Sequence, residues 1–122
     1  MLEAKVAITE ASAKPAEKHI HVLLKTNALC RKIAGVIGTS CKSGKDRTAM
    51  GVTLDATSHL VSTFGAQDGK EVCQTLRMYG VRRMNVYANT GQAMYAFGPL
   101  DRLALPACYS PPAQTCSGTV NT

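Results

Sequence analysis

With 122 residues, the chain is long enough for one compact domain and short for two. Hydrophobic residues make up 45% of it and charged residues 18%, a composition that is typical of a folded protein and not of a disordered tail. Its net charge of +6 favours an anionic partner, but four Tyr, two Phe and no Trp leave no alternation of aromatic and basic residues for binding nucleic acid.

The first third of the chain predicts a leader, a helix and one short strand. Residues 1–16 are rich in alanine, and we expect them to form a loosely held leader. Apolar residues then recur at helical spacing from Ile20 to Ala34, which predicts a helix. Residues 36–40 form a short run with β-branched members, the pattern of a buried strand. This strand is expected to lead directly into a loop at 41–48.

The next two predicted elements are helices. The first is expected from Arg47 to about Val61, because its apolar residues can share one face. The second begins after Asp68, whose side chain can form a capping box with Glu71. We expect it to end at Gly80, since glycine readily takes the left-handed conformation of a helix C-cap. The predicted apolar face of this second helix consists of Val72, Leu76 and Tyr79.

A fourth helix is expected at 92–105, where Pro106 would stop it. The prolines and small polar residues that follow predict an irregular C-terminal tail at 110–122. The predicted fold is therefore α/β but mostly helical, with one strand leading into a loop and a helical bundle after it. Its domain would span 17–109, between the leader and the tail.

Further expectations concern side chains outside the loop. The arginines around Gly80 are expected to lie in solvent at a helix end, where they could also form a basic lip; they are Arg77, Arg82 and Arg83. Three aromatic residues are expected in the core, namely Tyr95, Phe97 and Tyr109.

The loop carries the pattern Cys-x5-Arg between a predicted strand and a predicted helix. In such an arrangement, backbone N–H groups of the loop and the N-terminus of the helix converge on one anion. The same field lowers the pKa of a thiol from roughly 8.5 to roughly 3.5–7.5 and makes it nucleophilic. Cys41 is therefore predicted to attack phosphorus, and Arg47 to hold two phosphate oxygens in the transition state.

The remaining loop residues have more varied expected roles. Gly44 suits a tight loop with positive φ. Lys42 and Lys45 place more positive charge at the rim than one phosphate needs, which favours a substrate with several phosphates. Thr48 can hydrogen-bond the thiolate and assist hydrolysis of a phosphocysteine. Asp46 has two open interpretations, a general acid or a helix-capping carboxylate. The predicted phosphate-binding group consists of Lys42, Ser43, Gly44 and Lys45.

A nucleotide-binding Walker loop is the main rival interpretation of this segment. It would begin at Gly38 and use the pair Gly44-Lys45. Five residues separate the two glycines where four are needed, and Asp46 occupies the place of the magnesium-binding Ser or Thr. The pattern therefore excludes a Walker loop. A chance occurrence of Cys and Arg at this spacing stays open on spacing alone.

The loop from Cys41 to Thr48 resembles the C-terminal catalytic segment of inositol polyphosphate 4-phosphatases. The similarity continues downstream, in order and spacing, at Arg83-Met84-Asn85-Val86, Tyr95-Ala96-Phe97, Cys108-Tyr109 and Pro111-Pro112. It implies a hydrolase that needs no metal or cofactor and removes the 4-phosphate of phosphatidylinositol 3,4-bisphosphate and related inositol phosphates through a phosphocysteine. Lys42 and Lys45 would then contact the other ring phosphates.

Two further function classes stay open beside this one. The chain could be a catalytically silent phosphoinositide-binding fragment, or a protein-tyrosine or dual-specificity phosphatase. Five cysteines without a C-x-x-C pair indicate neither a disulfide framework nor a zinc site, which favours a reducing compartment. With no signal sequence and no apolar run of ~20 residues, we expect a cytoplasmic protein that meets membrane surfaces only transiently.

Overall fold

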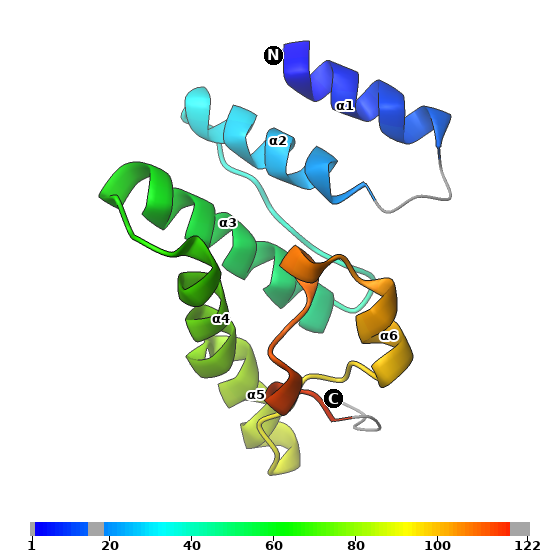
Figure 1. Cartoon of the computed structure of the whole chain (residues 1–122), viewed down its shortest axis with the longest axis vertical. Helices are drawn as coiled ribbons and strands as arrows, with labels where there is room; N and C mark the ends of the chain where they lie inside the picture. Colours follow the sequence, from blue (N-terminus) through cyan, green and yellow to red (C-terminus); the bar gives the residue numbers. More distant parts are fainter. Residues whose placement is uncertain (1, 15–18, 118–122) are drawn as a thin grey trace. The chain divides into compact units, whose positions relative to one another are not determined.

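The computed structural model describes residues 2–14 and 19–117, whose regular structure is helical (Figure 1). The mostly helical character that the sequence predicted is thus confirmed. The chain divides into two compact units, Met1–Gly38 and Thr39–Thr122, whereas its length predicted one.

The first unit is a pair of helices, α1 (Leu2–Ala13) and α2 (Ile20–Lys32), that pack against each other. The predicted second element is confirmed as α2, which ends two residues before Ala34. The prediction of a loosely held leader is wrong over α1, because its alanine-rich sequence has high helix propensity and Ala7 is fully buried. The last residues of the predicted leader, 15–16, lie outside the described residues.

The strand predicted at 36–40 is not formed. These residues have no regular secondary structure, and Val36 is 98% exposed. A buried strand needs partners for its backbone N–H and C=O groups. In the described part of the chain, β pairing is limited to one bridge between Tyr95 and Cys116. The segment has residues that favour a strand, but the described part of the chain contains no neighbouring strand with which it could pair.

Over its described residues, 39–117, the second unit contains four helices and two short 3-10 turns. They are α3 (Asp46–Phe64), α4 (Gly69–Tyr79), α5 (Val81–Thr90), α6 (Pro99–Ala104), η1 (Ala107–Tyr109) and η2 (Ala113–Thr115). Helix α3 packs along α4, and it also contacts η1. Because α3 begins directly after the loop at 41–45, these two contacts determine how the loop is held.

The limits of α4 agree with the prediction, but its end has a different cause. At its start, the Asp68 carboxylate accepts a hydrogen bond from the Glu71 N–H at 3.0 Å. At its end, Gly80 is extended (φ −79°) and not left-handed. A Cβ there would lie 2.2 Å from the Leu76 carbonyl oxygen. Glycine is therefore required by the close approach of two backbone segments where α5 begins.

The helix predicted at 92–105 is wrong for its first half. Gly91 takes a left-handed conformation (φ 73°) that ends α5, and residues 91–98 are not helical. The chain becomes helical again at Pro99, in the first helical position that proline favours. The single helix predicted at 92–105 is therefore a non-helical segment followed by the short helix α6.

The predicted irregular tail is ordered over 110–117. Tyr95 donates its N–H to the Thr115 carbonyl at 2.7 Å and accepts a hydrogen bond from the Ser117 N–H at 3.2 Å. Thr115 is only 1% exposed. The tail therefore packs against the segment between α5 and α6. The rest of the predicted tail, 118–122, lies outside the described residues.

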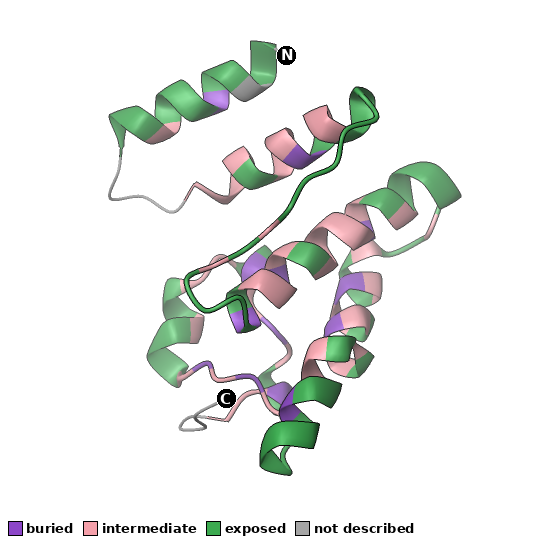
Figure 2. Cartoon of the chain, turned by 180° about the vertical axis from the view of Figure 1, so that it is seen from behind, coloured by how far each residue is buried: buried purple, intermediate pink, exposed green. Residues whose placement is uncertain are grey.

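The core of the second unit lies between α3 and α4 and along the segments that follow α5 (Figure 2). Its buried apolar residues are Met50, Cys73, Val86, Tyr95, Phe97 and Tyr109, which confirms the three predicted aromatic members. The predicted face of α4 is wrong at Tyr79, which is 74% exposed; Val72 and Leu76 are half-buried, and the buried residues of this helix are Cys73 and Arg77. Arg77 thus lies in the core and not in solvent.

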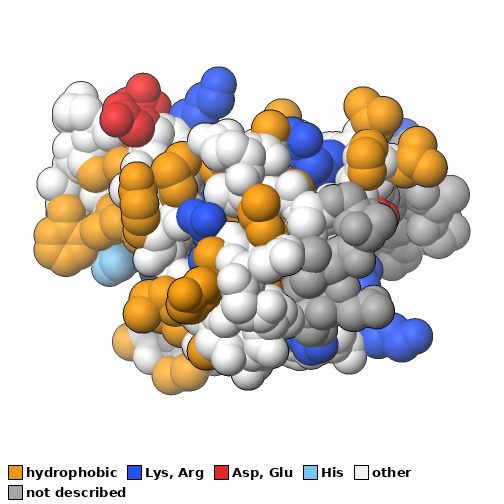
Figure 3. Space-filling view, turned by 90° about the horizontal axis from the view of Figure 1, so that it is seen from below, with side chains coloured by type: hydrophobic (Ala, Val, Ile, Leu, Met, Phe, Trp, Pro, Cys, Tyr) orange, Lys and Arg blue, Asp and Glu red, His pale blue; other side chains and the backbone are white. Residues whose placement is uncertain are grey.

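The surface combines apolar and basic side chains. Figure 3 shows hydrophobic side chains exposed among Lys and Arg on one face. Large exposed hydrophobic residues of the second unit include Phe64, Val81, Leu100 and Leu103. Of the described helices, none combines the length and the apolar character needed to cross a membrane.

Candidate active site at the loop before helix α3

The loop at 41–45 is a tight turn that leads into the N-terminus of α3. The Gly44 N–H donates to the Cys41 carbonyl at 3.1 Å, which closes the turn. Gly44 has φ +63°, as the sequence predicted, so a side chain at this position would be strained. Lys45 is the N-cap residue of α3. The turn therefore directs the backbone N–H groups of Ser43 and Lys45 toward the Cys41 sulfur.

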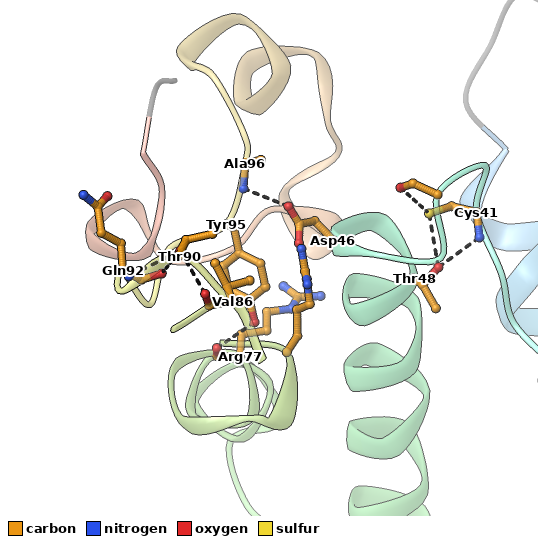
Figure 4. Close-up of polar contacts among 11 residues, drawn as sticks. Cys41, Asp46, Thr48, Arg77, Val86, Thr90, Gln92, Tyr95 and Ala96 are labelled. Carbon is orange, nitrogen blue, oxygen red and sulfur yellow. Dashed lines mark hydrogen bonds and ion pairs between the residues drawn. The ribbon is translucent and has the colours of Figure 1, made fainter. Parts of the chain in front are cut away.

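The Cys41 sulfur contacts a hydroxyl in the first turns of α3. The Thr48 Oγ1 lies 3.1 Å from the Cys41 Sγ and accepts a hydrogen bond from the Cys41 N–H at 2.9 Å (Figure 4). An amide N–H can only donate, so the hydroxyl oxygen is the acceptor of that bond. The hydroxyl proton of Thr48 is then directed at the sulfur.

These contacts lower the pKa of Cys41 to about 6. The hydrogen bond from Thr48 is the largest cause, and partial burial opposes it. Backbone N–H groups of Ser43 and Lys45 and the Ser43 hydroxyl, whose Oγ lies 3.8 Å from the sulfur, lower the pKa further. At pH 7 a thiol of this acidity is about nine-tenths thiolate. These contacts therefore favour the thiolate form of Cys41.

The basic residues of the loop lie at its rim. Lys42, Lys45 and Arg47 are exposed. Arg47 occupies the second position of α3, and its carbonyl accepts a hydrogen bond from the Tyr109 hydroxyl at 3.0 Å. The structure thus brings Cys41 and Thr48 into direct contact and leaves the predicted phosphate-binding cations facing solvent beside them.

Asp46 is buried and forms two hydrogen bonds away from the sulfur. Its Oδ1 accepts from the Arg82 Nε at 2.5 Å, and its Oδ2 accepts from the Ala96 N–H at 2.8 Å (Figure 4). This ion pair joins the start of α3 to α5 and to the segment after it. The expectation that Arg82 lies in solvent is therefore wrong, because its side chain is mostly buried against Asp46.

Arg77 is a buried neighbour of α3 whose position the sequence did not predict. It is 1% exposed, and its guanidinium donates to the Thr53 hydroxyl and to backbone carbonyls on α3 and around η1. The carbonyl acceptors are Met50 at 3.2 Å, Cys108 at 2.8 Å and Ser110 at 2.9 Å. Arg83 also turns inward, toward the carbonyls of Met78 and Ala93. The sequence signal for the burial of Arg77 is its position four residues after Cys73, which places both residues on the same face of a helix.

A cavity of about 410 Å³ borders the loop at Gly44, Lys45 and Thr48. Its other walls come from α3, α4, α5 and Tyr95, and most of the side chains there are apolar. An inositol phosphate is too polar for such a lining, so we expect a phosphate ligand at the solvent-facing rim instead. Among the described residues, no group of three or more His, Cys, Asp or Glu side chains is placed to hold a metal ion.

The loop therefore holds a cysteine thiolate beside the N-terminus of a helix, a position that favours an anion. The family model described as the INPP4A C-terminal domain matches residues 6–109 of the chain, and the chain therefore belongs to this family. The resemblance to inositol polyphosphate 4-phosphatases is thereby confirmed.

The relatives are long enzymes of which this chain covers a small part. It is 36% identical over 100 residues to the type II inositol 3,4-bisphosphate 4-phosphatase of Rattus norvegicus, and 35% identical to the inositol polyphosphate 4-phosphatase type II of Homo sapiens. Each alignment covers 80% of this chain and 11% of the relative. No solved structure matches the chain.

Proposed function

We propose that the chain acts as a phosphoric monoester hydrolase that removes the 4-phosphate of phosphatidylinositol 3,4-bisphosphate and related inositol phosphates. The observation that carries this proposal is the contact of 3.1 Å between the Thr48 hydroxyl and a Cys41 sulfur whose pKa is about 6. The printed names of its relatives, which are inositol 3,4-bisphosphate 4-phosphatases, support the choice of substrate.

The reaction has two steps. First, the Cys41 thiolate attacks phosphorus, the bond from phosphorus to the ring oxygen breaks, and that oxygen takes up a proton from water. Second, water attacks the phosphocysteine, the S–P bond breaks, and inorganic phosphate and the thiolate are released. The Thr48 hydroxyl stabilises the departing thiolate. Arg47 turns over the loop and binds two phosphate oxygens, which stabilises the charge of both transition states.

The rest of the loop binds the substrate. N–H groups of Ser43 and Lys45 bind oxygens of the reacting phosphate, Gly44 provides the tight turn that places them, and the Lys42 and Lys45 side chains bind the other ring phosphates. The reaction as written uses no metal or cofactor. The basic and apolar surface would meet anionic lipid headgroups at the cytoplasmic face of a membrane, where the protein associates transiently.

For Asp46 we propose a structural role. Both of its oxygens accept hydrogen bonds from N–H donors, one of them a guanidinium, so the carboxylate is engaged away from the loop sulfur. The variant Asp46→Asn should then lower the Tm of the second unit. A general acid would instead show lost turnover at an unchanged Tm, together with loss of the basic limb of the pH profile.

The experiment is phosphate release from a panel of inositol phosphates and from a short-chain phosphatidylinositol 3,4-bisphosphate. Cys41→Ser should abolish release, while Cys108→Ser, which changes an exposed thiol, should leave it unchanged. Release that persists in Cys41→Ser would exclude the covalent mechanism.

A catalytically silent phosphoinositide-binding module is the second candidate. It is favoured by the exposed cations that surround the loop. It predicts salt-sensitive binding to vesicles that contain phosphatidylinositol 3,4-bisphosphate, with no release of phosphate. Release from a tyrosine phosphopeptide, but from no inositol phosphate, would favour a protein phosphatase instead.

A further inference from the structure

The Tyr109 hydroxyl, at the end of η1, contacts the first turn of α3. Tyr109 is 8% exposed, and its hydroxyl donates to the Arg47 carbonyl at 3.0 Å across 62 residues of sequence. Burial first, and then the negative charge of Cys41, raise the pKa of Tyr109. The hydroxyl therefore keeps its proton and acts as a donor at neutral pH.

The Tyr109 hydroxyl can lie against α3 because residue 51 is a glycine and has no side chain. A Cβ at Gly51 would lie 2.7 Å from the Tyr109 oxygen and 3.3 Å from the Thr39 Cγ2. A side chain at position 51 would therefore push the hydroxyl away from α3. Because Gly51 has no side chain, the phenol lies against the helix, near Thr39, which leads into the loop.

Tyr109 itself is fixed by Arg77. The guanidinium of Arg77 donates to the carbonyls on both sides of Tyr109, those of Cys108 and Ser110. It also donates to the Met50 carbonyl on α3. One buried cation thus holds both neighbours of Tyr109 against the helix that carries the loop. The phenol has little freedom to turn away from Arg47.

We propose that Tyr109 is a positioning residue of the candidate active site, which fixes the first turn of α3 through the Arg47 carbonyl and thereby keeps Thr48 in contact with Cys41. A carbonyl has two lone pairs, and that of Arg47 also faces the amide four residues further along α3. The hydroxyl adds a restraint without replacing the helical bond. Loss of the hydroxyl therefore leaves α3 formed but lets its first turn move.

The role of Tyr109 in catalysis rests on the proposed function, but its effect on the thiol can be measured without turnover. Alkylation by iodoacetamide follows the thiolate fraction of a cysteine. Trypsin releases residues 33–42 as one peptide, whose only cysteine is Cys41, so mass spectrometry can follow this thiol alone. The rate would be measured from pH 5 to pH 9 on the full chain.

Tyr109→Phe keeps the ring and removes the hydroxyl. It should slow alkylation of Cys41 about twofold at pH 6, as expected if the pKa of the thiol rises by about half a unit. The matched control is Tyr87→Phe, an exposed residue on α5, which should keep the wild-type pH profile. A Tyr109→Phe profile that coincides with that of the wild type overturns the proposal, whatever the change in Tm.

Gly51→Ala tests the same contact without changing the tyrosine. It should shift the alkylation profile in the same direction as Tyr109→Phe, because the new methyl group displaces the hydroxyl. An unchanged profile in Gly51→Ala also counts against the proposal. If the wild-type chain releases no phosphate, the proposed function fails, whereas the alkylation profiles still decide the role of Tyr109.

Discussion

Thr48→Val is the most direct test of how the site activates its cysteine, because it keeps the shape of the side chain and removes the hydroxyl. Four hydrogen bonds lower the pKa of Cys41 from 9.0 to about 6, and that from Thr48 is the largest. It therefore accounts for at least a quarter of the lowering. At pH 6 the thiolate fraction, and with it the alkylation rate, should fall at least about threefold, and at most about 500-fold if all activation is lost.

The assay is iodoacetamide alkylation of the tryptic peptide 33–42, measured as a function of pH. Thr63→Val, an exposed threonine near the far end of α3, is the matched control and should keep the wild-type profile. A Thr48→Val protein that is alkylated at the wild-type rate across the whole pH range refutes the reasoning. The thiol would then owe its acidity to the backbone N–H groups and to the Ser43 hydroxyl.

Two further predictions concern stability, read from tyrosine fluorescence because all four tyrosines lie in the second unit. Arg77→Met removes four hydrogen bonds, three to carbonyls and one to a hydroxyl, and should cost about 2–4 kcal/mol in urea unfolding. Lys70→Met on the same helix should change the unfolding midpoint little, and equal midpoints for the two variants would contradict this prediction. Because folding lowers the pKa of Cys41, its contribution to stability is present above about pH 9 and is lost as the pH falls through about 6. The Tm of wild type relative to Cys41→Ser should therefore rise from pH 6 to pH 9, and parallel curves would contradict the linkage.

The local chemistry of the loop was predictable because it depends on residues close together in sequence. Gly44 at positive φ and Thr48 at the thiol both follow from the requirements of a tight turn that opens a helix. The capping side chain of Asp68 is equally local. In each case the interacting groups lie within seven residues of each other, so the pattern in the sequence contains both partners.

The contacts that hold the loop in place were not predictable for the opposite reason. Arg77 and Arg82 were expected in solvent, since arginine is rarely buried without a partner and nothing nearby in the sequence supplies one. Their partners lie far away, in Asp46 and in the carbonyls around η1. The strand at 36–40 failed likewise, because strand formation depends on a neighbour and not on propensity alone.

Thr48 contacts Cys41 locally, and we propose that the distant residue Tyr109 holds it in place. A double-mutant cycle can test whether Tyr109 acts on the thiol through Thr48. If Tyr109 acts by placing the Thr48 hydroxyl, its effect on the thiol depends on that hydroxyl. Tyr109→Phe should then slow alkylation in the wild-type background and have no further effect in Thr48→Val. If the two residues act independently, for example because Tyr109 orients the N–H groups of Ser43 and Lys45, the two rate factors should multiply. If the two rate factors multiply, Tyr109 still affects the loop, but it does not act through the Thr48 hydroxyl.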